Sequence, residues 1–198
     1  MKVYTNLDLT NYNSYKIKAH CDKAYFPENE EDVVSFFKTN KDFILLGSGH
    51  NIIFSKEHYQ KPMVIFNGNY NAINLIDEGL LEVEAGAMMW DVAKFALDKE
   101  LSGLEIFWDI PSSLGGAVVM NAGASGEEIK DVLVKVRYLD LHDNQIKEIR
   151  KEDISFEYRN SFFQKNTDKI VLKAWLQLQK GNKETISQKM ETIKAQRW

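Results

Sequence analysis

Hydrophobic residues recur with a helical period in three parts of the chain, each bordered by polar residues. In the first part Asn29 can cap the start, and acidic residues fill the first turn, as is typical of a helix N-terminus. In all three parts the apolar residues are spaced to share one buried face. The predicted helices are residues 27–40 with Val33, Val34 and Phe37 on that face, residues 89–100 with Val92, Phe95 and Ala96, and residues 183–198 with Ile186, Met190 and Ile193.

Shorter apolar or alternating segments between these helices predict strands. Two are short apolar runs, typical of buried strands. Two longer segments contain a polar turn, at Glu78-Gly79 and at Asp143-Asn144, and each predicts a hairpin. The last segment alternates, so its apolar residues point to one side. The segments are residues 42–46, 62–67, 73–86, 133–149 and 169–180, the last with Ile170, Leu172, Ala174, Leu176 and Leu178 on its apolar side.

This order of elements predicts an α+β protein with two lobes. A small βαβ lobe would occupy residues 1–67, and a larger sheet lobe ending in an amphipathic helix would occupy residues 68–198. The chain of 198 residues is long enough for both.

Composition narrows the class of protein. The net charge of −4 argues against nucleic acid as the main partner. Cys21 is the only cysteine, so an internal disulfide is excluded and a cytoplasmic setting is expected. No apolar run approaches the ~20 residues of a membrane helix, and the first 20 residues have no signal-peptide core, so no membrane partner is expected.

Two segments follow neither period and are poor in large side chains. Residues 45–54 (LLGSGHNIIF) place a glycine turn after a predicted strand, and residues 109–126 (DIPSSLGGAVVMNAGASG) contain four glycines. Glycine permits positive φ and close approach, and successive amides in such turns bind anions. Each segment alone could be a tight connection, but together they predict a long ligand with a diphosphate. Neither spacing fits a Rossmann or a Walker nucleotide site.

These segments resemble the motifs of a known family, UDP-N-acetylenolpyruvoylglucosamine reductase (UDP-N-acetylmuramate dehydrogenase). Its two flavin-binding segments are similar to LLGSGHNIIFS and to GLEIFWDIPSSLGGAVVMNAGASGEEIKDV, and its Tyr-Arg-x-Ser element is similar to YRNSFF at residues 158–163. The resemblance extends from NSYKIKAH to KMETIKAQR. It implies the two-lobed FAD-binding fold of the vanillyl-alcohol-oxidase type, with the pyrophosphate on backbone amides of residues 47–51 and 112–117.

The resemblance also implies a reaction and its residues. NADPH would reduce FAD, which would deliver hydride to the enolpyruvyl double bond of a UDP-sugar. Arg159 would stabilise the enolate-like intermediate, since a guanidinium stays charged and can hold a carboxylate in bidentate geometry. The alternative is that Arg159 is a solvated surface arginine. Tyr158 would lie on the substrate side. The implied FAD contacts are Leu46, Gly47, Ser48, Gly49, His50, Asn51, Ile52, Ile110, Pro111, Ser112, Ser113, Gly115, Gly116, Ala117, Asn121, Ala122 and Gly123.

Several positions depart from the family pattern. Asp109 and Ser112 stand where the family usually has glycine, and Trp108 replaces a small residue. The family's proton-donating serine and a glutamate belong to a third, substrate-binding lobe, which would begin about where this sequence ends, at Trp198. We therefore expect FAD binding with an open flavin face, and little turnover unless a partner chain or a second copy covers it.

His50 stands where the family usually has serine, and three interpretations stay open. It contacts the flavin noncovalently, it bonds covalently to the flavin 8α-methyl as in some flavoproteins of the wider fold, or it only caps the turn. The other histidines, His20, His58 and His142, form no cluster with other ligand residues at metal-binding spacing, so no metal site is predicted.

Two classes of function therefore stay open. The first is a compact FAD-dependent oxidoreductase acting on a UDP-sugar or another small molecule, in peptidoglycan or nucleotide-sugar metabolism. The second is a flavin-binding scaffold or fragment without turnover of its own. Trp108, Trp175 and Trp198 could form an apolar surface for oligomerisation, or could pack in the core.

Overall fold

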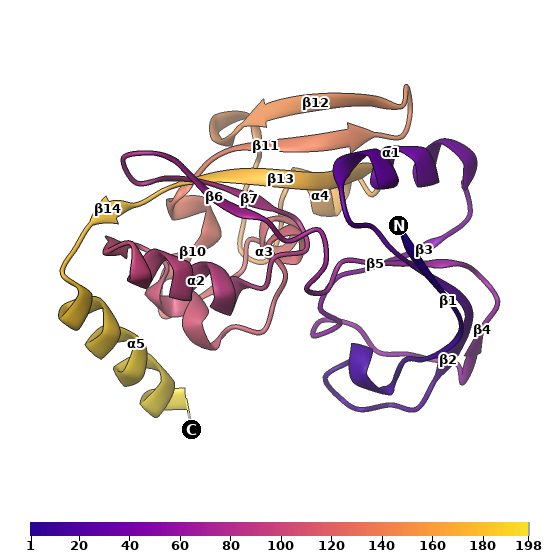
Figure 1. Cartoon of the computed structure of the whole chain (residues 1–198), viewed down its shortest axis with the longest axis horizontal. Coiled ribbons are helices and arrows are strands. Elements are labelled where there is room, and N and C mark those ends of the chain that lie inside the picture. Colours follow the sequence, from indigo (N-terminus) through magenta and orange to yellow (C-terminus); the bar gives the residue numbers. More distant parts are fainter. Residues whose placement is uncertain (198) are drawn as a thin grey trace.

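A computed structural model describes residues 1–197 of the chain, and Trp198 lies outside the described residues. The strands form two separate main sheets, one from residues 2–65 and one from residues 73–177 (Figure 1). The strands are β1 (Lys2–Asp8), β2 (His20–Phe26), β3 (Ile44–Leu46), β4 (His58–Tyr59), β5 (Met63–Ile65), β6 (Ile73–Asp77), β7 (Leu80–Glu84), β8 (Leu101–Ser102), β9 (Gly123–Ala124), β10 (Glu127–Glu128), β11 (Leu133–Asp140), β12 (Gln145–Arg150), β13 (Lys169–Gln177) and β14 (Gln179–Lys180).

Most of the α-helices lie against the second sheet. In Figure 1, α2, α3 and α5 lie on one side of the second sheet, and α1 lies over the junction with the first. The α-helices are α1 (Glu30–Thr39), α2 (Met89–Asp98), α3 (Leu114–Met120), α4 (Phe162–Lys165) and α5 (Lys183–Arg197), and the 3-10 helices are η1 (Thr10–Tyr12), η2 (Glu105–Asp109), η3 (Ile129–Asp131) and η4 (Lys151–Asp153).

The first sheet is mixed. Its strand order is β1-β2-β5-β3, with β4 beside β2, and only the β1–β2 pair is antiparallel. Helix α1 crosses from β2 to β3, and its start is capped as predicted, because Asn29 Oδ1 accepts a hydrogen bond of 2.8 Å from the Asp32 amide. This crossover places the end of β3 at the edge where the glycine turn begins.

The second sheet has the order β12-β11-β13-β7-β6, and all its pairs are antiparallel. Both predicted hairpins are present, β6–β7 and β11–β12. The predicted apolar side of β13 is buried, but Val171 and Trp175 on its other side are buried too. Trp175 is covered by Lys135, whose Nζ lies 4.1 Å from the ring centroid. The predicted burial of β13 on one side differs from its observed burial on both sides because β13 is the central strand, and a central strand can be covered on both faces.

The buried apolar residues form two clusters that do not coincide with the two sheets. Helix α1, which follows β2 in the first part of the chain, contributes Val33, Phe36 and Phe37 to the larger cluster under the second sheet. The division into residues 1–67 and 68–198 therefore stays a prediction. The smaller cluster of the first sheet consists of Leu9, Ala19, Cys21, Ala24, Phe26, Leu46, Phe54, Met63 and Ile65.

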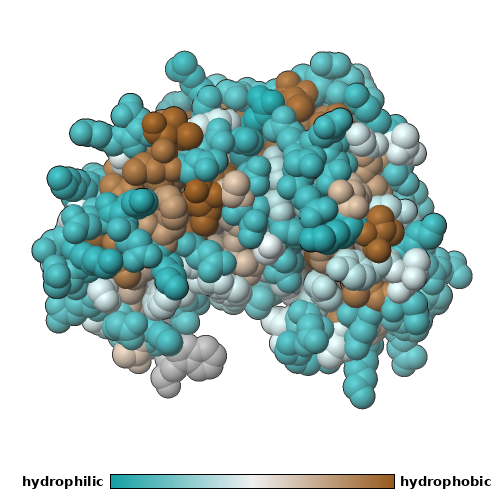
Figure 2. Space-filling view, in the orientation of Figure 1, coloured by the Kyte–Doolittle hydropathy of each residue, from teal (hydrophilic) through white to brown (hydrophobic). Residues whose placement is uncertain are grey.

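Of the three tryptophans suggested as an apolar surface, Trp108 and Trp175 belong to the described residues, and neither is exposed. Trp175 is only 9% exposed, so the alternative of core packing holds for it. Trp108 is half-buried against the larger core, and Trp198 is the residue outside the described part. Apolar residues instead gather over the β6–β7 hairpin (Figure 2), where Leu75 and Ile76 of the edge strand are exposed. Among residues 1–197, no helix has the length and apolar composition of a membrane span.

A buried carboxylate fixes one end of the second sheet. Asp140, at the end of β11, accepts hydrogen bonds of 2.7 Å from Lys147 Nζ and from Lys169 Nζ. These two ammonium groups hold the pKa of the Asp140 carboxyl well below its usual range. The interaction therefore stabilises the fold above the ordinary aspartate pKa of about 4 and is lost as the pH falls further towards the lowered value.

We expect Asp140→Asn to lower the free energy of unfolding near pH 7 by about 2 kcal/mol, because it leaves two lysines without their shared carboxylate. This figure already allows for the solvent that reaches Lys147. The melting temperature should fall by about 6 °C. The difference from the wild type should shrink as the pH falls below about 4, because the unfolded chain then takes up a proton that the native carboxylate does not. Asp143→Asn is the control, because its side chain is exposed; equal losses in both variants would contradict the prediction.

Candidate functional site

A cleft of about 600 Å³ brings together the two segments that the sequence singled out. One wall is formed by the end of β3 and the following turn. The other is formed by the second glycine segment (residues 109–126), which includes helix α3. Ser48 Oγ donates a hydrogen bond of 3.2 Å to the Pro111 carbonyl and so joins the two walls. The lining residues are Leu45, Leu46, Gly47, Ser48, Gly49, His50, Asn51, Ile52, Ile110, Pro111, Ser112, Gly116, Val119, Met120, Ala122, Gly123, Arg159 and Gln164.

The glycine turn (residues 47–51) offers free backbone amides to the cleft. Among the described residues, none of its five N–H groups donates a hydrogen bond to another protein group. Buried or half-buried N–H groups are normally paired, so this turn is suited to an anionic ligand. Gly49 has φ +74°, a conformation that favours glycine. Gly47 lies so close to α3 that a Cβ there would be 2.9 Å from Ser113 Oγ.

The second glycine segment offers fewer amides than the sequence predicted. The amides of Ser112, Leu114, Gly115 and Ala117 donate hydrogen bonds of 2.8–2.9 Å to backbone carbonyls of the protein. The Gly116 amide makes only a long bond of 3.4 Å, to Ser113 Oγ. Of these six residues, only Ser113 and Gly116 have an amide without a short hydrogen bond in the described part of the chain, and only Gly116 of the two lines the cleft. Gly116 is therefore the residue of this segment best placed for the predicted pyrophosphate contact.

Ser112 supplies a polar group instead. Its Oγ is buried in the wall of the cleft and has no hydrogen-bond partner. A buried hydroxyl without a partner costs free energy, which a polar ligand beside it would recover. The free amides of the glycine turn and this hydroxyl both fit a ligand rich in hydrogen-bonding oxygens, as a dinucleotide is.

Five residues of the predicted site do not line the cleft. Ser113 is buried as the N-cap of α3, and Ala117 is buried in the core. Gly115 packs against Ala85, where a Cβ would be 3.3 Å from the Ala85 Cβ and carbonyl. Asn121 is fully buried at the end of α3, and Tyr158 is 81% exposed outside the cleft. Trp108 and Asp109, two residues that depart from the family pattern, do not line the cleft either.

Arg159 reaches the cleft from a tight turn. Glu157 and Asn160 exchange backbone hydrogen bonds of 3.0 and 3.2 Å, with Tyr158 and Arg159 between them and φ +53° at Arg159. The guanidinium donates from Nη2 to the Gly123 carbonyl at 2.5 Å and from Nη1 to the Asn121 carbonyl at 3.3 Å. Positive φ in a non-glycine residue is costly and is often kept at functional sites. The arginine is therefore positioned rather than freely solvated.

Asn121 positions this turn. Its Nδ2 donates a hydrogen bond of 3.1 Å to the Glu157 carbonyl, while its own carbonyl accepts from Arg159. It is the left-handed C-cap of α3, with φ +44°. In this structure Asn121 supports the turn that carries Arg159 and does not line the cleft, and its predicted FAD contact stays a prediction.

His50 is exposed at the rim of the cleft. Desolvation lowers the pKa of its imidazole; an interaction with the Ser48 backbone opposes this shift, and the charge of Lys16 adds to it. The neutral ring is then the main form at pH 7, and it can act as a nucleophile, donor or acceptor. The three interpretations of His50 stay predictions.

Sequence reasoning missed four lining residues, Leu45, Val119, Met120 and Gln164. Val119 and Met120 could have been found, because a helix that brings Gly116 to the cleft also brings the residues three and four positions later to the same face. Gln164 directly follows the Tyr-Arg element (residues 158–163) and had no signal of its own.

No metal site is visible among the described residues, since no group of three or more His, Cys, Asp or Glu side chains could hold an ion. Two of the histidines nevertheless meet. The rings of His20 and His58 stack with centroids 4.5 Å apart, and His58 Nε2 lies 2.5 Å from an oxygen of Asp22.

Replacing Gly116 tests the narrowed contact. A Cβ at Gly116 would be 3.4 Å from Ser113 Oγ, an ordinary contact, so Gly116→Ala should fold and gain helix propensity. Gly116→Leu should weaken flavin binding by about tenfold or more, because its side chain would fill space between α3 and the ligand. Titration of the apoprotein with FAD measures the affinity, and unchanged affinity in the leucine variant would show that the ligand does not approach this amide.

Comparison with known proteins identifies the class of this site. The family model of the FAD binding domain matches residues 22–150. A solved UDP-N-acetylenolpyruvylglucosamine reductase from Thermus caldophilus matches 100% of this chain and 70% of its own, with a TM-score of 0.84 and 27% identity. An alkyldihydroxyacetonephosphate synthase, 20% identical with a TM-score of 0.60, shares the fold. The chain is thus an FAD-binding protein with the predicted α+β fold of the vanillyl-alcohol-oxidase type.

Curated relatives narrow this class to one family. The chain is 38% identical over 192 residues to UDP-N-acetylenolpyruvoylglucosamine reductase of Francisella tularensis, covering 96% of this chain and 68% of the relative. It is 35% identical to that of Fusobacterium nucleatum, covering 91% and 64%. The chain belongs to the UDP-N-acetylenolpyruvoylglucosamine reductase family, which confirms the resemblance. It spans about two thirds of the length of these relatives.

Proposed function

We propose that this chain supplies the flavin half of the reduction of an enolpyruvyl UDP-sugar. FAD would lie along the cleft with its pyrophosphate on the free amides of the glycine turn. The observation that carries the proposal is that one cleft joins these amides to a fixed arginine, Arg159, on the opposite wall. The family of the chain supports the same assignment.

The bound flavin would take up hydride from NADPH and pass it to the substrate double bond. Of the protein groups, Arg159 would hold the negative charge that develops on the substrate carboxylate. Two of its five N–H groups bond the carbonyls of Asn121 and Gly123, and these bonds direct the planar fork. A charge held in place before the reaction costs no reorganisation during it.

Gln164 and Tyr158 extend this end of the site. Gln164 lines the cleft from helix α4, five residues after Arg159, and would present its side-chain amide to a ligand. Tyr158 is 81% exposed, so a substrate or another chain would have to cover it before it contributes. We infer that a partner chain or a second copy that covers this face would complete the substrate site.

Two of the three serines in the second glycine segment are poorly placed to supply the proton that the reduced product needs. Ser113 is 1% exposed and caps α3. Ser125 is exposed but does not line the cleft. The proposal therefore takes the proton from Ser112, whose unpartnered hydroxyl lines the cleft, from solvent or from the covering chain.

The test begins with the cofactor. The purified protein should carry a flavin that is released on denaturation and runs as FAD on chromatography, and NADPH should bleach its visible spectrum. FMN, or no flavin after reconstitution, would contradict the first step.

The second step is anaerobic. The flavin is reduced, UDP-N-acetylglucosamine enolpyruvate is added, and flavin reoxidation is followed against UDP-N-acetylglucosamine as the control ligand. Reoxidation with the enolpyruvyl substrate alone supports the oxidoreductase. Reoxidation by air only, in an FAD-loaded protein, would favour the flavin-binding scaffold instead.

A further inference from the structure

The glycine turn rests on a loop from the beginning of the chain. Gly49 lies directly on the backbone of residues 12–13, so that a Cβ on Gly49 would be 1.9 Å from the Tyr12 carbonyl oxygen. The Ser14 amide also donates a hydrogen bond of 3.3 Å to the Gly49 carbonyl. The conformation of the turn is therefore set partly by residues about 35 positions earlier.

One buried amide side chain closes this loop. Asn13 is 3% exposed. Its Nδ2 donates hydrogen bonds of 3.0 Å to the carbonyls of Leu9 and of Ile17, and its Oδ1 accepts one of 2.9 Å from the Ile17 amide. These bonds join the two ends of loop 9–17 (residues 9–17). Without them the loop would lose the support that keeps residues 12–14 against Gly49.

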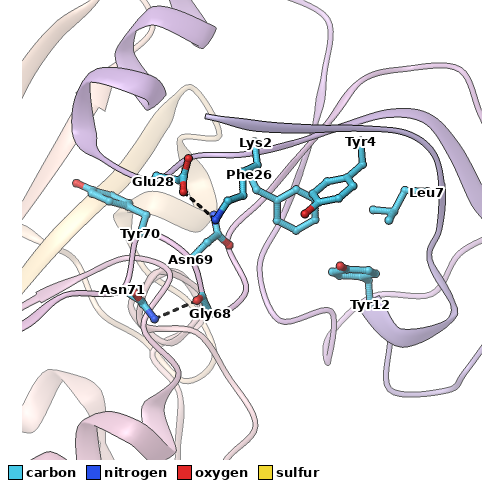
Figure 3. A pocket seen from close by; sticks show the side chains of 10 residues that line it. All are labelled: Lys2, Tyr4, Leu7, Tyr12, Phe26, Glu28, Gly68, Asn69, Tyr70 and Asn71. Carbon is cyan, nitrogen blue, oxygen red and sulfur yellow. Dashed lines mark hydrogen bonds and ion pairs between the residues drawn. The ribbon is translucent and has the colours of Figure 1, made fainter.

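The loop is also fixed from the opposite side. Figure 3 shows Tyr12 beside Phe26, Tyr4 and Leu7 in the wall of a second cavity, of about 460 Å³. The rings of Tyr12 and Phe26 have centroids 5.8 Å apart. Tyr12 thus packs its side chain on the first sheet while its carbonyl contacts the glycine turn.

Loop 9–17 brings one cation towards the cleft. Lys16 has φ +53°, and its Nζ donates a hydrogen bond of 3.1 Å to Asn11 Oδ1. It is near enough to His50 for its charge to lower the pKa of that imidazole. The positive charge of an exposed lysine near the cleft would attract a pyrophosphate, although solvent and salt screen this attraction.

We propose that loop 9–17 is a positioning element of the flavin site, in which Asn13 holds the amides of the glycine turn in place for the pyrophosphate. The proposal rests on the pyrophosphate position proposed above. Asn13 touches no ligand and acts only through the turn. Groups that orient ligand-binding groups typically change affinity by about tenfold when removed.

The variant that tests this is Asn13→Asp, which keeps the shape and the acceptor but loses both N–H donors. Asn13→Ala removes the acceptor as well. The matched controls are Asn11→Ala, which loses one exposed contact in the same loop, and Asp140→Asn, which should destabilise the fold far from the cleft. FAD affinity is measured by titration of each apoprotein, together with its melting temperature and the 31P spectrum of the bound pyrophosphate.

We expect Asn13→Asp to bind FAD about tenfold more weakly and to shift the pyrophosphate 31P signals, with Asn11→Ala and Asp140→Asn close to the wild type. Equal affinity and unchanged 31P signals in Asn13→Asp and Asp140→Asn would overturn the proposal. Wild-type protein that binds no FAD would instead remove the proposed function.

A measurement on the wild type decides the matter even if both Asn13 variants fail to fold. FAD should slow the hydrogen exchange of the Ser14 and Ile17 amides as well as that of residues 47–51, because loop and turn would be fixed together. Slower exchange at residues 47–51, with no change at Ser14 and Ile17, would show that loop 9–17 does not respond to the ligand and would contradict the proposal.

Discussion

Arg159→Lys should lower the rate of substrate-dependent flavin reoxidation by about 100-fold while leaving the flavin content unchanged. A lysine ammonium keeps the positive charge. It cannot, however, bond the carbonyls of Asn121 and Gly123 and at the same time offer a carboxylate two parallel N–H donors. The backbone should hold its conformation, since lysine and arginine pay the same cost for φ +53°. Single-turnover kinetics measure the rate, and the ratio of visible to protein absorbance measures the flavin.

Arg150→Lys is the control for this change. Arg150 is an exposed arginine in β12 on the second sheet, outside the cleft, so the same substitution there should change neither rate nor flavin content. A rate in Arg159→Lys equal to that of Arg150→Lys would show that Arg159 has no catalytic part. Loss of flavin in Arg159→Lys would instead assign the arginine to cofactor binding.

Gly49→Ala should reduce FAD affinity by about 100-fold or abolish binding. The alanine Cβ would meet the Tyr12 carbonyl oxygen at 1.9 Å, so the turn or the loop beneath it would have to move. A shift of about 1 Å in preorganised groups can cost a factor of this size. The left-handed φ of +74° adds about 1 kcal/mol of backbone strain for any residue with a Cβ.

Gly68→Ala separates the two causes. Gly68 has a nearly identical φ of +77°, but a Cβ there meets no atom within 4 Å. This control should lose a similar amount of stability through strain and keep its FAD affinity. If Gly68→Ala weakens FAD binding as much as Gly49→Ala, global destabilisation explains the loss and the turn is not the binding element.

Local signals allowed much of the fold to be predicted from the sequence. The cap at Asn29 and the turns of both hairpins depend on residues close together in the chain. Strand β1 could not be recognised, because its residues are exposed apart from Leu7 and therefore show no apolar alternation. The burial of Val171 and Trp175 depends on which elements cover β13, and only tertiary structure decides that.

The candidate site was predictable as two segments but not as a set of contacts. Glycine content predicts close approach without saying what approaches. Gly49 approaches the protein's own backbone, Gly115 packs on Ala85, and only Gly116 has both an open face and a weakly bonded amide. The exposure of Tyr158 beside the inward-facing Arg159 follows from the tight turn between Glu157 and Asn160, which a motif does not encode.

The central position of β13 has a consequence for the order of folding. Its partner β7 ends at Glu84, whereas β13 begins at Lys169, so this pairing closes a very long loop. Contacts of such sequence separation form slowly, and until they form the inner edges of β7 and β11 are unpaired. Helix α3, the wall of the cleft, packs against β13. During synthesis the cleft is therefore expected to bind flavin only after residue 177 has left the ribosome. Flavin binding would then indicate that β13 has paired within the second sheet.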